Sequence, residues 1–140
     1  MALRAKYLAD KSALARLPLP PVAQVLGPLV VGGEVTTCGI IDLELLYSAR
    51  NHAELVAIRA ERAAFPTVAT VQADVDRAAD VMEALARGGR HRAAGIPDLL
   101  IAAVAERAGL VLLHYDSDFD QIALVTGQPA RWVVPRGTVA

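Results

Sequence analysis

Residues 110–119 read LVLLHYDSDF, and this stretch decides the class of fold. Its first five residues are a short run rich in Leu and Val, which predicts a strand buried on both faces. Such strands are typical of parallel sheets that helices cover on both sides. The run ends two residues before Asp116, so we expect a carboxylate just past the carboxyl end of this strand.

Short apolar runs alternate with helical patterns along the rest of the chain. Four more strands are expected, at residues 6–10, 34–37, 67–71 and 130–134. Helices are expected at residues 11–17, 22–31, 39–50, 53–64, 74–87, 97–109 and 117–127. This alternation predicts an α/β fold with three layers, in which helices cover both faces of a central parallel sheet.

Two of these helices carry more specific expectations. The helix at residues 39–50 is apolar nearly all round, which predicts that it is buried. In the last helix, Ser117 is followed three residues later by Asp120, a pattern that predicts a capping box.

The size and composition of the chain limit what it can be. Its 140 residues predict one compact domain, residues 1–140. The formal net charge of −1 provides no basic tail that could hold nucleic acid unaided. A substrate that carries phosphate would therefore have to meet the acidic residues through cations. The mean hydropathy of +0.38 is high for a small monomer, so we expect a partner or a dimer.

Other features of the sequence point to the cytoplasm. Cys38 is the only cysteine, so no disulfide can form within the chain. The first residues lack the apolar stretch of a secretion signal. The longest uncharged stretch, residues 17–33, is too rich in Pro and Gly for a membrane helix.

Four carboxylates interrupt apolar runs, where an unpaired charge costs several kcal/mol: Asp10, Glu44, Asp98 and Asp116. Asp10 and Asp116 each follow a predicted strand, and ligands of parallel sheets gather beyond the strands' carboxyl ends. Asp98 lies in a first helical turn, where the helix dipole favours an anion. Oxygen ligands without a His or Cys cluster favour a hard ion, Mg²⁺ or Mn²⁺.

Each acid also has a simpler interpretation when it is taken alone. Asp10 could cap a helix, and Asp98 could merely complement a helix dipole. Asp116 could be a turn residue, while an arginine could pair with Glu44. Asp118 could be an ordinary first-turn acid, but it lies closest to Asp116 and remains a candidate for the site.

Four segments together resemble a known family: LADKSA at residues 8–13, the helix that carries Glu44, IPDLLIAA at residues 96–103 and HYDSDFD at residues 114–120. In this order and spacing they resemble a PIN domain, and within that family a VapC-type toxin of a bacterial toxin–antitoxin pair. The resemblance implies a sheet ordered 3-2-1-4-5 and a Mg²⁺- or Mn²⁺-dependent endoribonuclease that leaves a 5′-phosphate and a 3′-hydroxyl.

The resemblance also implies roles for individual residues. Asp10, Asp98 and Asp116 would hold the metal directly or through water, and Glu44 would ligate it or orient a water. Ser12 and Asp118 would be supporting residues: Ser12 would hydrogen-bond a carboxylate or a water, and Asp118 would be a fifth acid.

The partners implied by the resemblance are an RNA substrate and a VapB-type antitoxin. The resemblance also implies a homodimer held by the helical layer and a hetero-oligomer of toxin with antitoxin. No membrane partner is expected. Residues 22–31 could then belong to the dimer interface, to the antitoxin groove or simply to the core. Lys11 departs from the small residue usual in these toxins, and it could contact a substrate phosphate or point to solvent.

Rival functions fit the residues less well. A phosphotransferase of the haloacid dehalogenase kind needs a second Asp where this chain has Ser12, and a response-regulator receiver needs a late lysine, whereas the last one here is Lys11. A PIN fold kept only as an RNA-binding or assembly module would be expected to lack one of the four acids, and none is missing. Cleavage of DNA by the same site stays an alternative.

Overall fold

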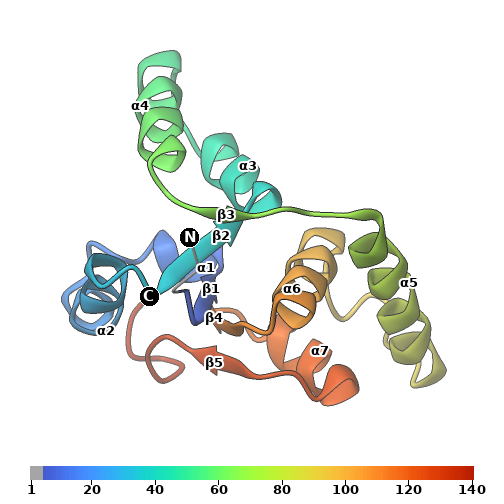
Figure 1. Cartoon of the computed structure of the whole chain (residues 1–140). Coiled ribbons are helices and arrows are strands. Elements are labelled where there is room, and N and C mark those ends of the chain that lie inside the picture. The colour runs from blue at the N-terminus through green and yellow to red at the C-terminus, as the bar shows by residue number, and fades with distance from the viewer. Residues whose placement is uncertain (1–4) are drawn as a thin grey trace.

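A computed structural model describes residues 5–140, and its centre is a five-stranded sheet in the order β3-β2-β1-β4-β5 (Figure 1). All four pairs of neighbouring strands are parallel. The strands are β1 (Tyr7–Ala9), β2 (Val35–Cys38), β3 (Thr67–Val68), β4 (Val111–His114) and β5 (Ala130–Trp132). The helices are α1 (Lys11–Leu14), α2 (Pro20–Val31), α3 (Gly39–Tyr47), α4 (His52–Ala63), α5 (Gln72–Arg87), α6 (Ile96–Ala108) and α7 (Asp118–Thr126). The predicted parallel sheet and its strand order are confirmed.

Successive residues of the central strands point into two different cores. Leu8 and Leu112 pack in one cluster with residues of α5, α6 and α7, including Leu85. Their neighbours Ala9 and Leu113 pack in the second cluster with residues of α1 and α2. Because side chains alternate along a strand, helices bury both faces of the sheet, which confirms the three-layer α/β/α architecture.

The pairing of β1 with β4 brings the ends of these two strands level. Ala9 lies opposite Leu113, and the backbone N–H of Asp10 donates to the carbonyl of Leu113 at 2.9 Å. The chain leaves β1 at Asp10 and leaves β4 just before Asp116, so both carboxylates emerge at the same edge of the sheet.

Local sequence fixes the helix that faces this edge. Pro97 lies in the first turn of α6, where its missing N–H costs nothing. Gly109 ends the helix with a φ of 70°, a left-handed conformation that glycine adopts without strain. Both helix ends agree with the sequence-based prediction. Among the described residues, no helix is long and apolar enough to cross a membrane.

The prediction of a buried helix at residues 39–50 is wrong. In α3 only Ile41 is fully buried, whereas Leu43 is 66% and Tyr47 is 91% exposed. The helix stands with α4 at the edge of the sheet beside β3, which has only two residues and offers little surface to cover it (Figure 1). Helix α4 itself has no buried residue, so one face of α3 stays open.

The predicted capping box at Ser117 is also wrong. The Ser117 side chain makes no capping hydrogen bond, and Asp116 takes this role by accepting from the backbone N–H of Asp118 at 2.9 Å. Asp120 instead accepts from the indole N–H of Trp132 at 3.1–3.2 Å. A tertiary partner has therefore displaced the local bond that the pattern suggested.

Candidate active site

The turn between β1 and α1 holds Asp10 in one orientation. The side chain is only 3% exposed, and its Oδ2 accepts from the Ser12 backbone N–H at 2.9 Å and from the Ser12 hydroxyl at 2.6 Å. Asp10 thus caps α1, as one interpretation of the sequence suggested. Its other oxygen, Oδ1, is buried and has no hydrogen-bond partner within residues 5–140. Capping therefore uses only half of this carboxylate.

Ser12 joins the two halves of the site. While its hydroxyl donates to Asp10, the same oxygen accepts from the backbone N–H of Tyr115 at 2.8 Å. This bridge connects the turn after β1 to the segment after β4. Ser12 consequently fixes the separation of Asp10 from the residues that follow Tyr115.

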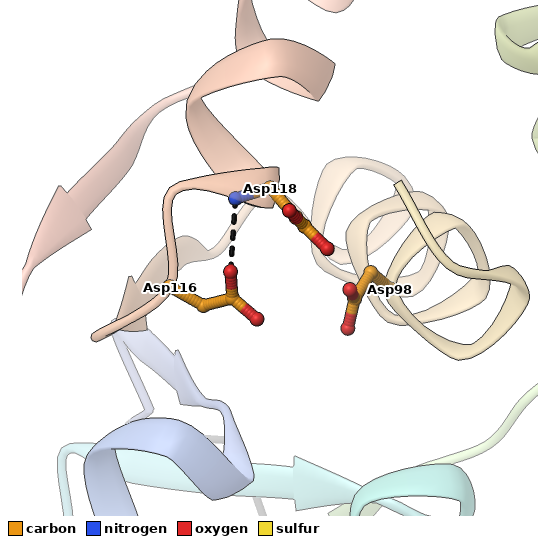
Figure 2. A group of neighbouring side chains, drawn as sticks. All are labelled: Asp98, Asp116 and Asp118. Carbon is orange, nitrogen blue, oxygen red and sulfur yellow. Dashed lines mark hydrogen bonds between the residues drawn. The ribbon is translucent and has the colours of Figure 1, made fainter. Parts of the chain in front are cut away.

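Three aspartates, one from α6 and two from the segment that leads into α7, form a close acidic group. Asp98, Asp116 and Asp118 each offer a carboxylate oxygen, and these oxygens lie within 4.8 Å of one another. Figure 2 shows Asp98 reaching from α6 toward the two aspartates that precede and begin α7. Asp118, only a supporting candidate in the sequence, is therefore one of the three members of this cluster. Asp10 lies outside this group of three but close enough for its charge to act on Asp98.

Glu44 approaches the same place from α3. Its side chain is half-buried, and its Oε1 is a second buried oxygen without a hydrogen-bond partner among the described residues. The alternative that an arginine satisfies Glu44 is not supported within that part of the chain. Arg62 instead pairs with Asp42 at 3.1 Å, so Asp42 has a structural role.

Burial and mutual repulsion make this cluster costly to ionise. Burial, assisted by the charges of Asp10 and Asp116, raises the pKa of Asp98 to about 8. Burial also raises the pKa of Asp10, although the two hydrogen bonds from Ser12 oppose the shift. The pKa of Glu44 is raised by burial and by the charge of Asp10. A bound cation would reverse these shifts by favouring the charged carboxylates.

The donor set fits a divalent cation. It consists of carboxylate oxygens alone, and two of these, on Asp10 and Glu44, are buried without any partner in residues 5–140. Buried acceptors are ordinarily satisfied, so these oxygens indicate that a ligand completes the site. Oxygen-only coordination is what Mg²⁺ and Mn²⁺ prefer.

His114, a titratable base beside the acidic cluster, has a structural role. The ring is fully buried, and its Nδ1 accepts from the Asp116 backbone N–H at 3.2 Å. It packs against Phe119 and Trp132 with ring centroids 5.1 Å away in each case. Burial lowers its pKa, which keeps the imidazole neutral at pH 7. His114 thus orients the backbone of Asp116 from the core.

Two pockets flank the acidic cluster, and sequence analysis had singled out Lys11, Glu44 and Asp116 among their lining residues but not Tyr47 or Trp132. One, of about 290 Å³, lies between α1, α3 and α6, and Lys11, Glu44 and Tyr47 line it. Another, of about 360 Å³, lies beside Asp116 and includes Trp132. Trp132 is the only tryptophan and lies on the strand next to β4, which is the one sequence signal that could have drawn attention to it.

The fold and this acidic centre define a class of protein, and comparison with known proteins agrees. The family model described as PIN domain matches residues 9–125. The chain therefore belongs to the PIN-domain family, within its VapC-type group. It is 46% identical over 134 residues to Ribonuclease VapC51 of Mycobacterium tuberculosis, covering 96% of this chain and 97% of that relative.

Solved structures show the same fold. A chain of the DNA-bound VapBC from Salmonella typhimurium superposes with a TM-score of 0.73 at 16% identity, covering 93% of this chain and 99% of that one. A chain of VapBC-5 from Mycobacterium tuberculosis gives 0.62 at 25% identity, with 91% and 97% covered. The overall fold is thus shared with chains of solved toxin–antitoxin complexes.

Proposed function

We propose that this chain, as a single PIN domain, is a metal-dependent endoribonuclease and the toxin of a toxin–antitoxin pair. One observation carries the proposal: carboxylates from distant parts of the chain meet at one sheet edge, and some of their buried oxygens have no partner among the described residues. The 46% identity to a protein named as a ribonuclease supports RNA as the substrate.

Each acid has a proposed role in hydrolysis of a phosphodiester bond. Asp10, Asp98 and Asp116 would hold Mg²⁺ or Mn²⁺, and Asp118 lies where it can join them. The ion, when bound, supplies a water of lowered pKa and offsets charge on the phosphate. Ser12 keeps Asp10 in the orientation that leaves Oδ1 free for this purpose.

Glu44 is the residue best suited to receive a proton. Its Oε1 is buried and has no hydrogen-bond partner within the described chain, so this oxygen is free to accept a proton from a water held beside it. The attacking water would give a proton to Glu44 as its oxygen bonds to phosphorus. The bond from phosphorus to the 3′ oxygen breaks, and protonation of that oxygen by solvent leaves a 3′-hydroxyl and a 5′-phosphate.

We further propose two protein partners. A VapB-type antitoxin is supported by the solved VapBC complexes that share this fold. A second copy of the chain is supported by the open apolar face of α3, where Leu43 and Tyr47 are exposed. At high protein concentration, this exposed apolar surface should promote association between copies of the chain.

The test is cleavage of total cellular RNA by the antitoxin-free protein with Mg²⁺, with Mn²⁺ or with EDTA. Asp98→Asn should abolish cutting, whereas Asp80→Asn, which removes the same charge from an exposed position of α5, should cut like the wild type. Discrete cuts that need metal and Asp98 are the expected result. Equal cutting by Asp98→Asn would refute the assignment of the site, and binding of RNA without any cleavage would favour a silent RNA-binding module.

A further inference from the structure

The pocket beside Asp116 has a chemistry different from the acidic cluster that it adjoins. Its volume is about 360 Å³, and Arg16, Tyr115, Trp132 and Arg136 line it together with Asp116. It lies on the β5 side of the site, whereas Glu44 enters from α3 beyond β2 at the other side of the sheet. A substrate strand that passes over the acidic cluster and continues away from α3 would therefore reach this pocket.

The indole ring of Trp132 is held in a fixed orientation. Its N–H donates to both carboxylate oxygens of Asp120, at 3.2 and 3.1 Å. Tyr115 meets the ring edge-on, with centroids 5.2 Å apart and an interplanar angle of 81°, and His114 packs at 5.1 Å. A ring that is already immobilised loses little entropy when a planar group stacks on it.

Two guanidinium groups add positive charge to this pocket. Arg136 is exposed, and its guanidinium carbon lies 5.7 Å from the Trp132 centroid. Arg16 lies 4.7 Å above the Tyr115 ring and donates to the carbonyls of Ser12 at 2.8 Å and Ala140 at 2.9 Å. These bonds use two of the five donors of a guanidinium group, which leaves others for a phosphate.

We infer that this pocket is a nucleotide subsite for single-stranded RNA, in which a base stacks at Trp132 and Arg136 and Arg16 bind the adjoining phosphate. Stacking on an aromatic ring combined with arginine contacts is how single-stranded nucleic acid is commonly held. Asp116 belongs both to this pocket and to the acidic cluster, so the bound nucleotide neighbours the bond to be cut. The inference rests on the proposed ribonuclease function and adds to it a place where the substrate strand is held.

The pocket contains its own optical probe, because Trp132 is the only tryptophan of the chain. The Asp98→Asn protein, which should not cut, would be titrated with a hexauridylate oligonucleotide in Mg²⁺ while tryptophan fluorescence is recorded. A saturable change in emission is expected. Adding Arg136→Gln should weaken the Kd by about tenfold and reduce the slope of log K against log salt by about 0.7.

Arg131→Gln is the matched control. Arg131 is also exposed, and its guanidinium lies 5.7 Å from an aromatic ring, but that ring is Tyr7 and lies outside the pocket. Since Arg131 directly precedes Trp132 in β5, its side chain points to the other face of the sheet. The control should keep a Kd within about twofold of the parent and an unchanged salt slope.

Cleavage kinetics separate failure of the subsite from failure of the proposed function. In the otherwise wild-type protein, Arg136→Gln should raise the KM for RNA about tenfold and change kcat little. If the wild type cuts RNA but the variant has an unchanged KM and the emission does not respond, the subsite is refuted and the nuclease stands. If Arg136→Gln weakens only the binding of an acidic peptide or protein, the subsite for RNA is likewise refuted. If the wild type does not cut at all, the proposed function fails first.

Discussion

Helices α6 and α3 have similar apolar sequences and each brings a carboxylate to the site, yet they are covered very differently. Helix α6 buries Leu99, Ile101 and Val104, among others, between α5 and the sheet. Helix α3 buries only Ile41. An apolar helix pattern therefore predicts burial, but it does not show whether the same chain or another one provides the covering surface.

The position of each helix in the sheet explains this difference. Helix α6 precedes β4, which has a neighbouring strand on each side, β1 and β5, so the sheet offers α6 a broad surface to pack against. Helix α3 follows β2 and neighbours the two-residue edge strand β3 (Figure 1). Its apolar face is therefore left for another chain, as the proposed dimer requires.

The largest expected effect is the loss of cleavage rate when the acid that each helix carries, Asp98 in α6 or Glu44 in α3, is replaced. Asp98→Asn should lower kcat for RNA cleavage by about 10³-fold, and Glu44→Gln by about 10²-fold, since the first removes a proposed metal ligand and the second a proposed base. Cleavage rates measured across a Mn²⁺ titration would distinguish the two, because only Asp98→Asn should also shift the metal midpoint. Equal losses with identical midpoints would contradict these separate roles.

The next effect concerns packing. Ile101→Ala in α6 should lower the free energy of unfolding by about 2–5 kcal/mol, because it leaves a cavity in the core. Leu43→Ala in α3 should change it by no more than about 0.5 kcal/mol at concentrations where the chain is monomeric. Urea denaturation of both variants provides the measurement. A large loss for Leu43→Ala in dilute solution would mean that α3 is covered within a single copy.

A smaller effect concerns pH in the absence of metal. Because the pKa of Asp98 is raised to about 8 from an ordinary 3.8, the folded protein keeps a proton that the unfolded chain releases. The stabilisation that this proton provides is complete below about pH 4 and is lost as the pH rises toward 8. Asp98→Asn should flatten this decline in melting temperature, and Mg²⁺ should offset it in the wild type. An identical decline in the variant would show that Asp98 is not its source.

The smallest effect on the fold itself should come from Leu43→Lys. A charge on the open face of α3 should leave the free energy of unfolding of one copy within about 0.5 kcal/mol of the wild type. Light scattering should nevertheless show a smaller mass than that of the wild-type dimer at equal concentration. A dimer of unchanged stability would place the interface on another surface.

Much of the fold and the site could be predicted from the sequence. Strand and helix patterns gave the three layers, because both cores are built from strand residues that are apolar throughout, such as Leu112 and Leu113. The positions of Asp10 and Asp116 after two strands placed them at one edge, since parallel strands share the direction of their carboxyl ends. Asp98 was a candidate because it interrupts an apolar run, and its role as a metal ligand came from the family resemblance.

Features that depend on partners distant in sequence were not predictable. Ser117 and Asp120 formed a good local capping pattern, but the indole of Trp132 binds Asp120 and the carboxylate of Asp116 caps α7. The pocket around Trp132 forms because Arg16, from near the start of the chain, and Arg136, from near its end, line the same cavity. No spacing in the sequence predicts that residues so far apart lie together.

The central place of β1 has a consequence for how the protein is made. A ribosome releases β1 and Asp10 first, but the strand that pairs with one side of β1 is β4, and Asp116 and Asp118 follow it. The acidic centre is therefore incomplete until translation has passed residue 118. Under the proposed function, a nascent chain shorter than this would lack part of its metal site and would not yet cut the messenger that encodes it.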